Sequence, residues 1–166
     1  IQQWRVIQPA ITENNWSWEE RAIFAWIPTL TPISRQSIFA GKTPSLFPSS
    51  IDTTAKEADQ WRAFWLDHGV TEAQSAFVKF TGAKQQDAVE EQLPNLGHIA
   101  ALGVVFTAVD EMVHGTVLGI PQLISSIEVW NKTAVLKKLL TQLVDADFHV
   151  AIVSDHGNIA SHGIVS

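Results

Sequence analysis

Residues 101–115 read ALGVVFTAVDEMVHG, and the apolar run that opens this stretch decides the fold class. A near-continuous apolar run over 101–109 predicts a strand that is covered on both faces, as in a parallel sheet. Further strands are predicted at 21–27, 76–80 and 149–153, and helices at 31–40, 54–68 and 120–144, with a weaker helical pattern at 84–93. This alternation predicts an α/β domain with a mostly parallel sheet and helices on both faces.

Composition narrows the class of protein further. Of the 166 residues, 46% are hydrophobic and 17% are charged, which favours a compact globular body over disorder. The net charge of −6 and the lack of a basic patch give no support for nucleic-acid binding. There is no cysteine, which excludes disulfides and thiolate zinc sites and fits a cytoplasmic protein. No apolar run reaches membrane-spanning length, so no membrane partner is expected. We expect 1–166 to be one domain, cut at both ends.

In open parallel sheets, ligands bind beyond the carboxyl ends of the strands. This rule singles out three short segments, each of which follows a predicted strand: 28–34, 110–114 and 154–158. The last segment contains Asp155, His156 and Gly157. Gly157 permits the sharp turn that adjacent ligands need, and a carboxylate with an imidazole suits zinc or manganese. The alternative is a loop in which Asp155 caps a helix and His156 is exposed.

The segment after the central apolar run contains a second carboxylate–imidazole pair. If residues 110–114 form a helical turn, Asp110 and His114 lie four residues apart on one face, which is a spacing for metal ligands. The alternative is a helix start with Asp110 as cap and His114 on the surface. Glu111 is expected to be a solvated acid of the first turn.

The third segment places hydroxyl groups at the start of a helix. Thr31 lies in the stretch Pro28-Thr29-Leu30-Thr31, and free backbone N–H groups at a helix start suit a phosphoryl oxygen. A metal ion could lower the pKa of such a hydroxyl and make it a nucleophile. The commoner alternative is a threonine that only caps the helix.

Taken together, these segments resemble the PglZ family, which belongs to the alkaline phosphatase superfamily and occurs in BREX bacteriophage-defence systems. The resemblance covers nearly the whole chain. It is carried by 28–36 with Gly41, by Asp110 with His114-Gly115 and by 154–158, together with Ser50-Ile51, Thr53, Lys56-Glu57, Trp61 and Phe64-Trp65.

The resemblance implies a two-metal site with zinc or manganese, or magnesium as a further option. It matches Thr31 to the nucleophile, with Ser34 in reserve, Asp110 and His114 to ligands of the first metal, and Asp155 and His156 to ligands of the second. One further Asp is expected before Ile1 and one further His beyond the chain. His162 is a weak candidate, and His68, His98 and His149 are expected to be structural or exposed.

The implied function is a metal-dependent phosphohydrolase, a phosphatase or phosphodiesterase, which forms a phosphoenzyme on Thr31. Its expected partners are other defence proteins and a phosphoester substrate, with nucleic acid among the candidates. Arg35 could contact the phosphoryl group, but a structural ion pair is favoured. Two alternatives remain: a non-catalytic, metal-binding scaffold or regulatory subunit of the same assembly, and a mutase that uses the same ligands.

Overall fold

The computed structural model describes residues 2–12, 16–82, 89, 91–117 and 119–157. Its longer elements, in chain order, are α1 (Gln2–Thr12), α2 (Thr31–Ala40), α3 (Glu57–Asp67), β1 (Ser75–Phe80), β2 (Ala101–Phe106), α5 (Ala108–Gly115), α6 (Ile120–Lys132) and α7 (Val135–Asp145). Short 3-10 helices lie at Pro44–Leu46, Pro48–Ser50, Glu72–Gln74 and Leu96–His98. The described part of the chain is therefore mixed α/β but mostly helical.

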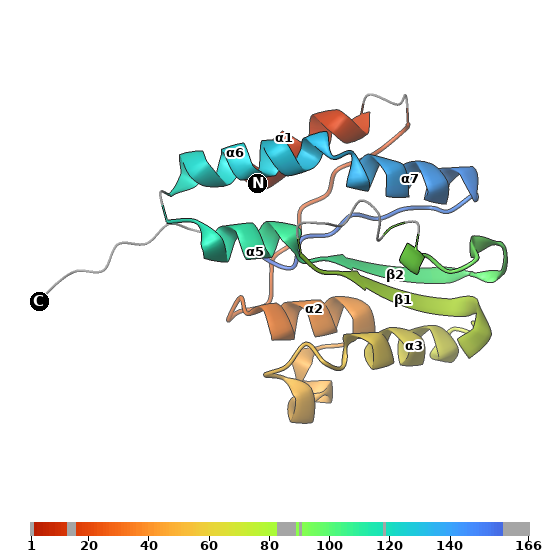
Figure 1. Ribbon diagram of the computed structural model, residues 1–166. Coiled ribbons are helices and arrows are strands. Elements are labelled where there is room, and N and C mark those ends of the chain that lie inside the picture. Colours follow the sequence, from red (N-terminus) through yellow and green to blue (C-terminus); the bar gives the residue numbers. More distant parts are fainter. Residues whose placement is uncertain (1, 13–15, 83–88, 90, 118, 158–166) are drawn as a thin grey trace, which may run out of the picture.

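Strands β1 and β2 pair in parallel, with Ser75 opposite Ala101 and Phe80 opposite Phe106. Figure 1 shows α2 and α3 on one face of this sheet and α7 on the other, with α1 and α6 on the same side as α7. Within the described residues the sheet has these two strands. The prediction of a parallel sheet between helical layers is thus confirmed for β1 and β2, but the described sheet is smaller than expected.

The alternation of side chains along each strand builds two different packing layers. Toward α7, Phe80 and Phe106 stack with ring centroids 4.9 Å apart, and Phe80 joins Leu139 and Leu143 in the main buried cluster. Toward α3, Gly103 leaves room for aromatic rings: a Cβ atom there would lie 2.8 Å from Phe77 Cδ2 and 3.1 Å from Trp61 Cδ2. Trp61 therefore packs against the sheet, as expected for a core residue.

Two predicted strands are wrong. Residues 21–27 and 149–153 form no strand, and their apolar side chains are exposed, with Phe24 fully open and Ile23 89% exposed. A strand requires a neighbour for its backbone hydrogen bonds. Neither segment pairs with β1 or β2, so their apolar composition is not accompanied by burial among the described residues.

The long helix predicted over 120–144 is divided into α6 and α7. Ala134 has a left-handed φ of 57°, and the Thr133 hydroxyl donates to the Trp130 carbonyl at 2.6 Å at the break. Because of this turn, α6 packs on α1 and α5, whereas α7 covers the sheet. The apolar period alone does not reveal the break, since both helices keep a buried face.

The shorter predicted helices are confirmed. Helix α2 begins at Thr31 and ends at Gly41, whose φ of 58° is the left-handed conformation that favours glycine. Helix α3 covers most of the predicted 54–68, and the weak helix predicted at 84–93 falls largely outside the described residues. No helix in the described ranges is long and apolar enough to cross a membrane.

Candidate metal and phosphoryl site

The carboxyl ends of β1 and β2, the start of α2 and the start of α5 lie on the same side of the molecule (Figure 1). Strand β2 leads directly into α5, which carries Asp110 and His114. Thr31 opens α2, and the loop at 154–157 returns to this side after α7. The topology therefore brings the three predicted segments to one edge of the sheet. Only 110–114 follows an observed strand, so the rule for parallel sheets accounts for that segment alone.

The closest contact between these segments joins Thr31 to His156. Thr31 Oγ1 lies 2.9 Å from His156 Nε2, although the two residues are 125 positions apart in the chain. His156 Nδ1 lies 3.0 Å from the Gly157 carbonyl, which can only accept a hydrogen bond. Nδ1 is therefore assigned the proton, and Nε2 keeps a lone pair directed at the Thr31 hydroxyl.

The loop that carries His156 is held by local hydrogen bonds. Ser154 Oγ donates to the His156 carbonyl at 2.7 Å, and the His156 N–H donates to Asp155 Oδ1 at 2.9 Å. Asp155 Oδ2 lies 3.7 Å from His156 Nε2, and both side chains are largely buried. Hydroxyl, carboxylate and imidazole donors thus converge, and this donor set fits zinc or manganese.

Asp110 and His114 form a second pair on α5. The expected helical turn is confirmed, and Asp110 Oδ1 lies 3.5 Å from His114 Nε2. Both side chains are more open than those of the first pair, with His114 79% exposed. Two ligands from one helix face fit a metal ion whose remaining ligands come from other parts of the protein.

The two pairs do not merge into a larger cluster. Across the described ranges, no three or more His, Cys, Asp or Glu side chains are placed to hold one metal ion. Each pair therefore offers two such donors, and Thr31 adds a hydroxyl to the first. His162 and Asn158 lie outside the described residues, and His68, His98 and His149 are exposed, as expected.

Arg35 does not point a free guanidinium at this edge. Its Nη2 lies 2.6 Å from Glu57 Oε2, and both side chains are nearly buried. The expected structural ion pair is therefore confirmed, and Arg35 is occupied by Glu57. Ser34, the reserve nucleophile, is 5% exposed, and its hydroxyl has no hydrogen-bond partner among the described residues. Burial makes Ser34 less suited than Thr31 to meet a substrate.

Glu111 lies beside the site and makes contacts that the sequence did not predict. Glu111, expected to be a solvated acid, accepts hydrogen bonds from the Gly82 N–H at 3.1 Å and from the Thr107 hydroxyl. These bonds lower the pKa of Glu111 below its usual value, the Thr107 bond contributing most. Glu111 thus ties the loop after β1 to the start of α5. The sequence signal for this role of Glu111 was its position directly after Asp110.

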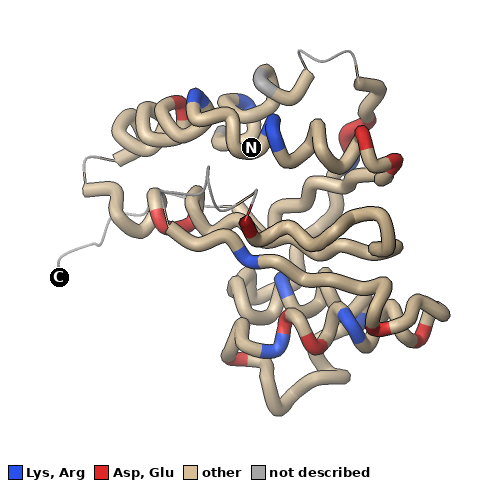
Figure 2. Tube along the Cα trace, turned by 45° about the vertical axis from the view of Figure 1, so that its right-hand side comes forward, with Lys and Arg blue, Asp and Glu red and all other residues tan. Residues whose placement is uncertain are grey.

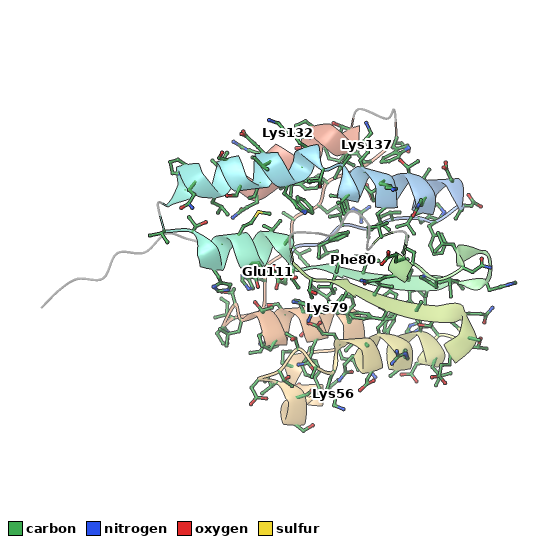
Figure 3. All side chains as sticks on the ribbon, viewed as in Figure 1. Lys56, Lys79, Phe80, Glu111, Lys132 and Lys137 are labelled. Carbon is green, nitrogen blue, oxygen red and sulfur yellow. The ribbon has the colours of Figure 1, made fainter. Side chains whose placement is uncertain are left out.

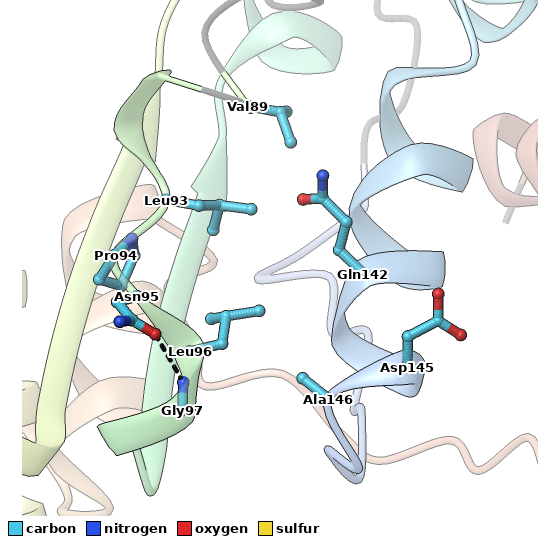
Figure 4. Close-up of a pocket in the computed structure, with 9 residues that line it drawn as sticks. All are labelled: Val89, Leu93, Pro94, Asn95, Leu96, Gly97, Gln142, Asp145 and Ala146. Carbon is cyan, nitrogen blue, oxygen red and sulfur yellow. Dashed lines mark hydrogen bonds between the residues drawn. The ribbon is translucent and has the colours of Figure 1, made fainter.

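A shallow open hollow lies elsewhere on the molecule. It is lined by residues that include Leu93, Asn95, Gln142 and Asp145, between the segment before β2 and the end of α7 (Figure 4). This is the amino end of β2, opposite to the edge that carries Thr31. The hollow is therefore separate from the candidate site.

Comparison with known families identifies the family of this chain. The family model described as the BREX system PglZ alkaline phosphatase-like domain matches residues 1–166. No curated protein matches the chain. Because the family match extends over every element described above, the chain belongs to the PglZ alkaline phosphatase-like domain family of BREX systems.

Proposed function

We propose that this domain is a metal-dependent phosphohydrolase in which Thr31 is the nucleophile. Membership of the alkaline phosphatase superfamily generally implies metal ions. The observation that carries the proposal is the 2.9 Å contact between Thr31 Oγ1 and His156 Nε2. It places a hydroxyl at a helix start beside an imidazole that is oriented to accept its proton or to bind an ion.

Asp155 and His156 would hold one divalent ion beside Thr31, and Asp110 with His114 would contribute to a second. Bound there, such ions supply charge that stabilises the phosphoryl oxygens and lowers the pKa of the attacking hydroxyl. The donor types suit zinc or manganese, and magnesium would rely more on the carboxylates.

The reaction then follows from the position of Thr31. Its Oγ1 attacks the phosphorus and forms a phosphothreonine, while the bond to the ester oxygen breaks and the leaving alcohol takes up a proton. Water subsequently attacks the same phosphorus, releases phosphate or its monoester, and regenerates the Thr31 hydroxyl. The free N–H groups of the first turn of α2 favour the negative charge of the phosphoryl oxygens in both steps.

The substrate is a phosphoester, and the partners are other components of the BREX assembly. The charge distribution gives a nucleic-acid substrate no particular support. Acidic and basic positions are interspersed over the described chain rather than gathered in one basic surface (Figure 2), and the net charge is −6. A small phosphoester or a phosphorylated protein fits this surface better than a polyanion.

Substitution of the nucleophile tests the proposal. Thr31→Ala is expected to lower kcat on an aryl phosphate or an aryl phosphodiester by about 1,000-fold or more, because the Thr31 hydroxyl is the one that lies against His156 Nε2 among the described residues. Thr31→Ser keeps a hydroxyl and should retain measurable turnover. Thr29→Ala, two residues away and exposed, is the matched control and should behave as wild type. Near-normal hydrolysis by Thr31→Ala would exclude this nucleophile.

A second candidate function is a metal-binding scaffold without turnover. It is favoured by one observation, that Asp110 and His114 stand apart from the other pair among the described residues. A scaffold would show thermal stability that falls on adding a chelator, yet no hydrolysis of any phosphoester by the full-length protein. Turnover that is lost with the same chelator would instead select the enzyme.

A further inference from the structure

Glu57 is a buried carboxylate at a junction of three elements. It opens α3, is 1% exposed, and its Oε2 lies 2.6 Å from Arg35 Nη2 on α2. The same oxygen lies 3.7 Å from Lys79 Nζ at the carboxyl end of β1. Figure 3 shows Lys79 between the sheet and α2. These three residues, here the Glu57 cluster, join the helix that bears Thr31 to the edge of the sheet.

Stability alone is a poor explanation for the Glu57 cluster. Removing a carboxylate and a guanidinium from water is costly, and well-packed apolar residues often stabilise a fold as much or more. The cluster is also incompletely paired: among the described residues, Glu57 Oε1 and Arg35 Nε are buried without a hydrogen-bond partner. A costly, directional contact is better explained by the geometry that it imposes.

That geometry concerns the first turns of α2. Thr31 and Arg35 are four residues apart, so they lie one above the other on the same face of the helix. Fixing the Arg35 guanidinium on Glu57 therefore fixes the direction in which Thr31 leaves the helix. Without this contact, α2 could rotate about its axis and carry Oγ1 away from His156.

Gln36 restrains the same helix from a second direction. It is fully buried, and its Nε2 donates to the Thr53 carbonyl at 2.7 Å while its Oε1 accepts from Ser50 Oγ at 2.7 Å. The loop before α3 is thus attached to α2, and this loop leads directly to Glu57. Adjacent residues of α2 are held by opposite ends of one segment, 50–57, which leaves the helix little freedom to shift.

We propose that Glu57 is a positioning residue, which acts through Arg35 to keep Thr31 directed at His156 without touching the substrate. The proposal rests on the proposed function of Thr31. It gives a role to Arg35 and Glu57 that goes beyond holding α2 and α3 together.

Two variants of the full-length protein test it. Glu57→Gln removes the charge and keeps the shape, whereas the double variant Arg35→Met with Glu57→Met removes both buried charges. We expect Glu57→Gln to lower kcat by about 10- to 100-fold with KM changed less than about 3-fold, since a displacement near 1 Å has effects of this size. The double variant should unfold at or above the wild-type midpoint and keep the lowered kcat.

A second measurement does not depend on turnover. The imidazole ring NMR signals of His156, assigned by comparison with His156→Ala, report the contact with Thr31. They should shift in Glu57→Gln and stay shifted in the double variant. Asp59→Asn is the matched control, because Asp59 lies on the same helix in exposed ion pairs with Lys56 and Arg62. It should leave kcat and the His156 signals unchanged.

The outcomes separate the two proposals. If kcat and the His156 signals both return to wild type in the double variant, the Glu57 cluster only holds the fold, and the positioning role is wrong. The same conclusion follows if Glu57→Gln changes neither. If the wild-type protein hydrolyses no phosphoester, the proposed function fails, and the His156 signals alone still decide whether Glu57 orients Thr31.

Discussion

The two Asp–His pairs reach the same edge of the molecule by different routes. Asp110 and His114 are delivered by β2 and α5, both regular elements within the packed body. Asp155 and His156 follow 149–153, an extended segment with exposed apolar side chains and no partner strand among the described residues. The pair on the regular scaffold is nevertheless the more open one, with His114 79% exposed against 14% for His156.

This difference shows that regular structure and a formed site are separate properties. Helical spacing brings Asp110 and His114 into contact, whereas β2 sets where α5 begins and therefore where this pair lies. His156 is placed by its contact with Thr31 and by a loop whose own hydrogen bonds direct Nε2 toward the Thr31 hydroxyl. We therefore expect the Asp155–His156 pair to be the tighter metal site and the one coupled directly to chemistry.

Removing each histidine in turn is expected to produce the largest difference in kcat between the two pairs. His156→Ala should lower kcat by about 1,000-fold or more even with excess Mn²⁺ or Zn²⁺, because the residue also contacts the nucleophile. His114→Ala should lose activity mainly at limiting metal and recover to within about 10-fold of wild type when metal is added, since ligand loss acts through affinity. Metal titrations of kcat measure both.

His149→Ala supplies the control, because His149 is an exposed histidine that precedes the same extended segment. The kcat of this variant should depend on added metal as it does in wild type. Equal rescue of His114→Ala and His156→Ala by metal would show that the two pairs do not differ in their coupling to Thr31. A larger irreversible loss in His114→Ala would reverse the comparison.

The support that β2 gives to the Asp110–His114 pair can be weakened separately. Gly103→Ala places a Cβ 2.8 Å from Phe77 Cδ2 and 3.1 Å from the Trp61 ring, and overpacking of this kind should destabilise the fold by about 1–3 kcal/mol. Denaturant unfolding gives this value. At Gly115, a Cβ would meet nothing within 4 Å, so Gly115→Ala should be neutral to within about 0.5 kcal/mol.

The same variant sharpens the comparison of the two pairs. Because β2 leads into α5, Gly103→Ala should also weaken metal binding at Asp110 and His114 in native conditions. The His156 ring signals should change less than in Glu57→Gln, since 149–157 does not pair with β2. Loss of both would mean that the two routes are coupled through the core.

How much of this was predictable differs between elements. The strands predicted at 76–80 and 101–109 are observed because each apolar run has a neighbouring strand, although β2 ends at Phe106 and the last predicted residues open α5. Helix α2 was predicted because its start and its glycine stop are local signals. The runs at 21–27 and 149–153 have the same composition, yet pairing depends on residues distant in sequence. An apolar composition indicates that a segment is suited to burial, but it does not indicate whether a partner strand is present.

The site divides in the same way. Helical spacing predicted the contact between Asp110 and His114. Thr31 and His156 share an edge as expected, but the strands predicted before them are not observed, so the rule of strand ends does not explain why they meet. The tautomer of His156 could not be foreseen, because it depends on the Gly157 carbonyl. The partner of Arg35 could not be read from spacing either, since Glu57 lies 22 residues further along the chain.

The smallest expected effect is a pH dependence of stability that arises at Glu57. The Glu57 cluster supports the helix that bears Thr31. Burial raises the pKa of Glu57 above its usual value of 4.5, although Arg35 and Lys79 act in the opposite direction. The folded state therefore holds the Glu57 proton more tightly than the unfolded state. The stability that this proton contributes is fully present below about pH 4.5 and is lost as pH rises through the folded pKa.

Glu57→Gln mimics the protonated form and should remove this decline. Urea unfolding of wild type and Glu57→Gln across pH 4 to 8, a range chosen to span values on both sides of about 4.5, measures the difference. An exposed glutamate changed in the same way, Glu72→Gln, should keep the wild-type slope. If Glu57→Gln also keeps the wild-type slope, Arg35 and Lys79 fully compensate the buried carboxylate, and its burial does not lower the stability. The Thr31 side would then be held by a well-matched ion pair, and the contrast with the exposed Asp110–His114 pair would be one of rigidity alone.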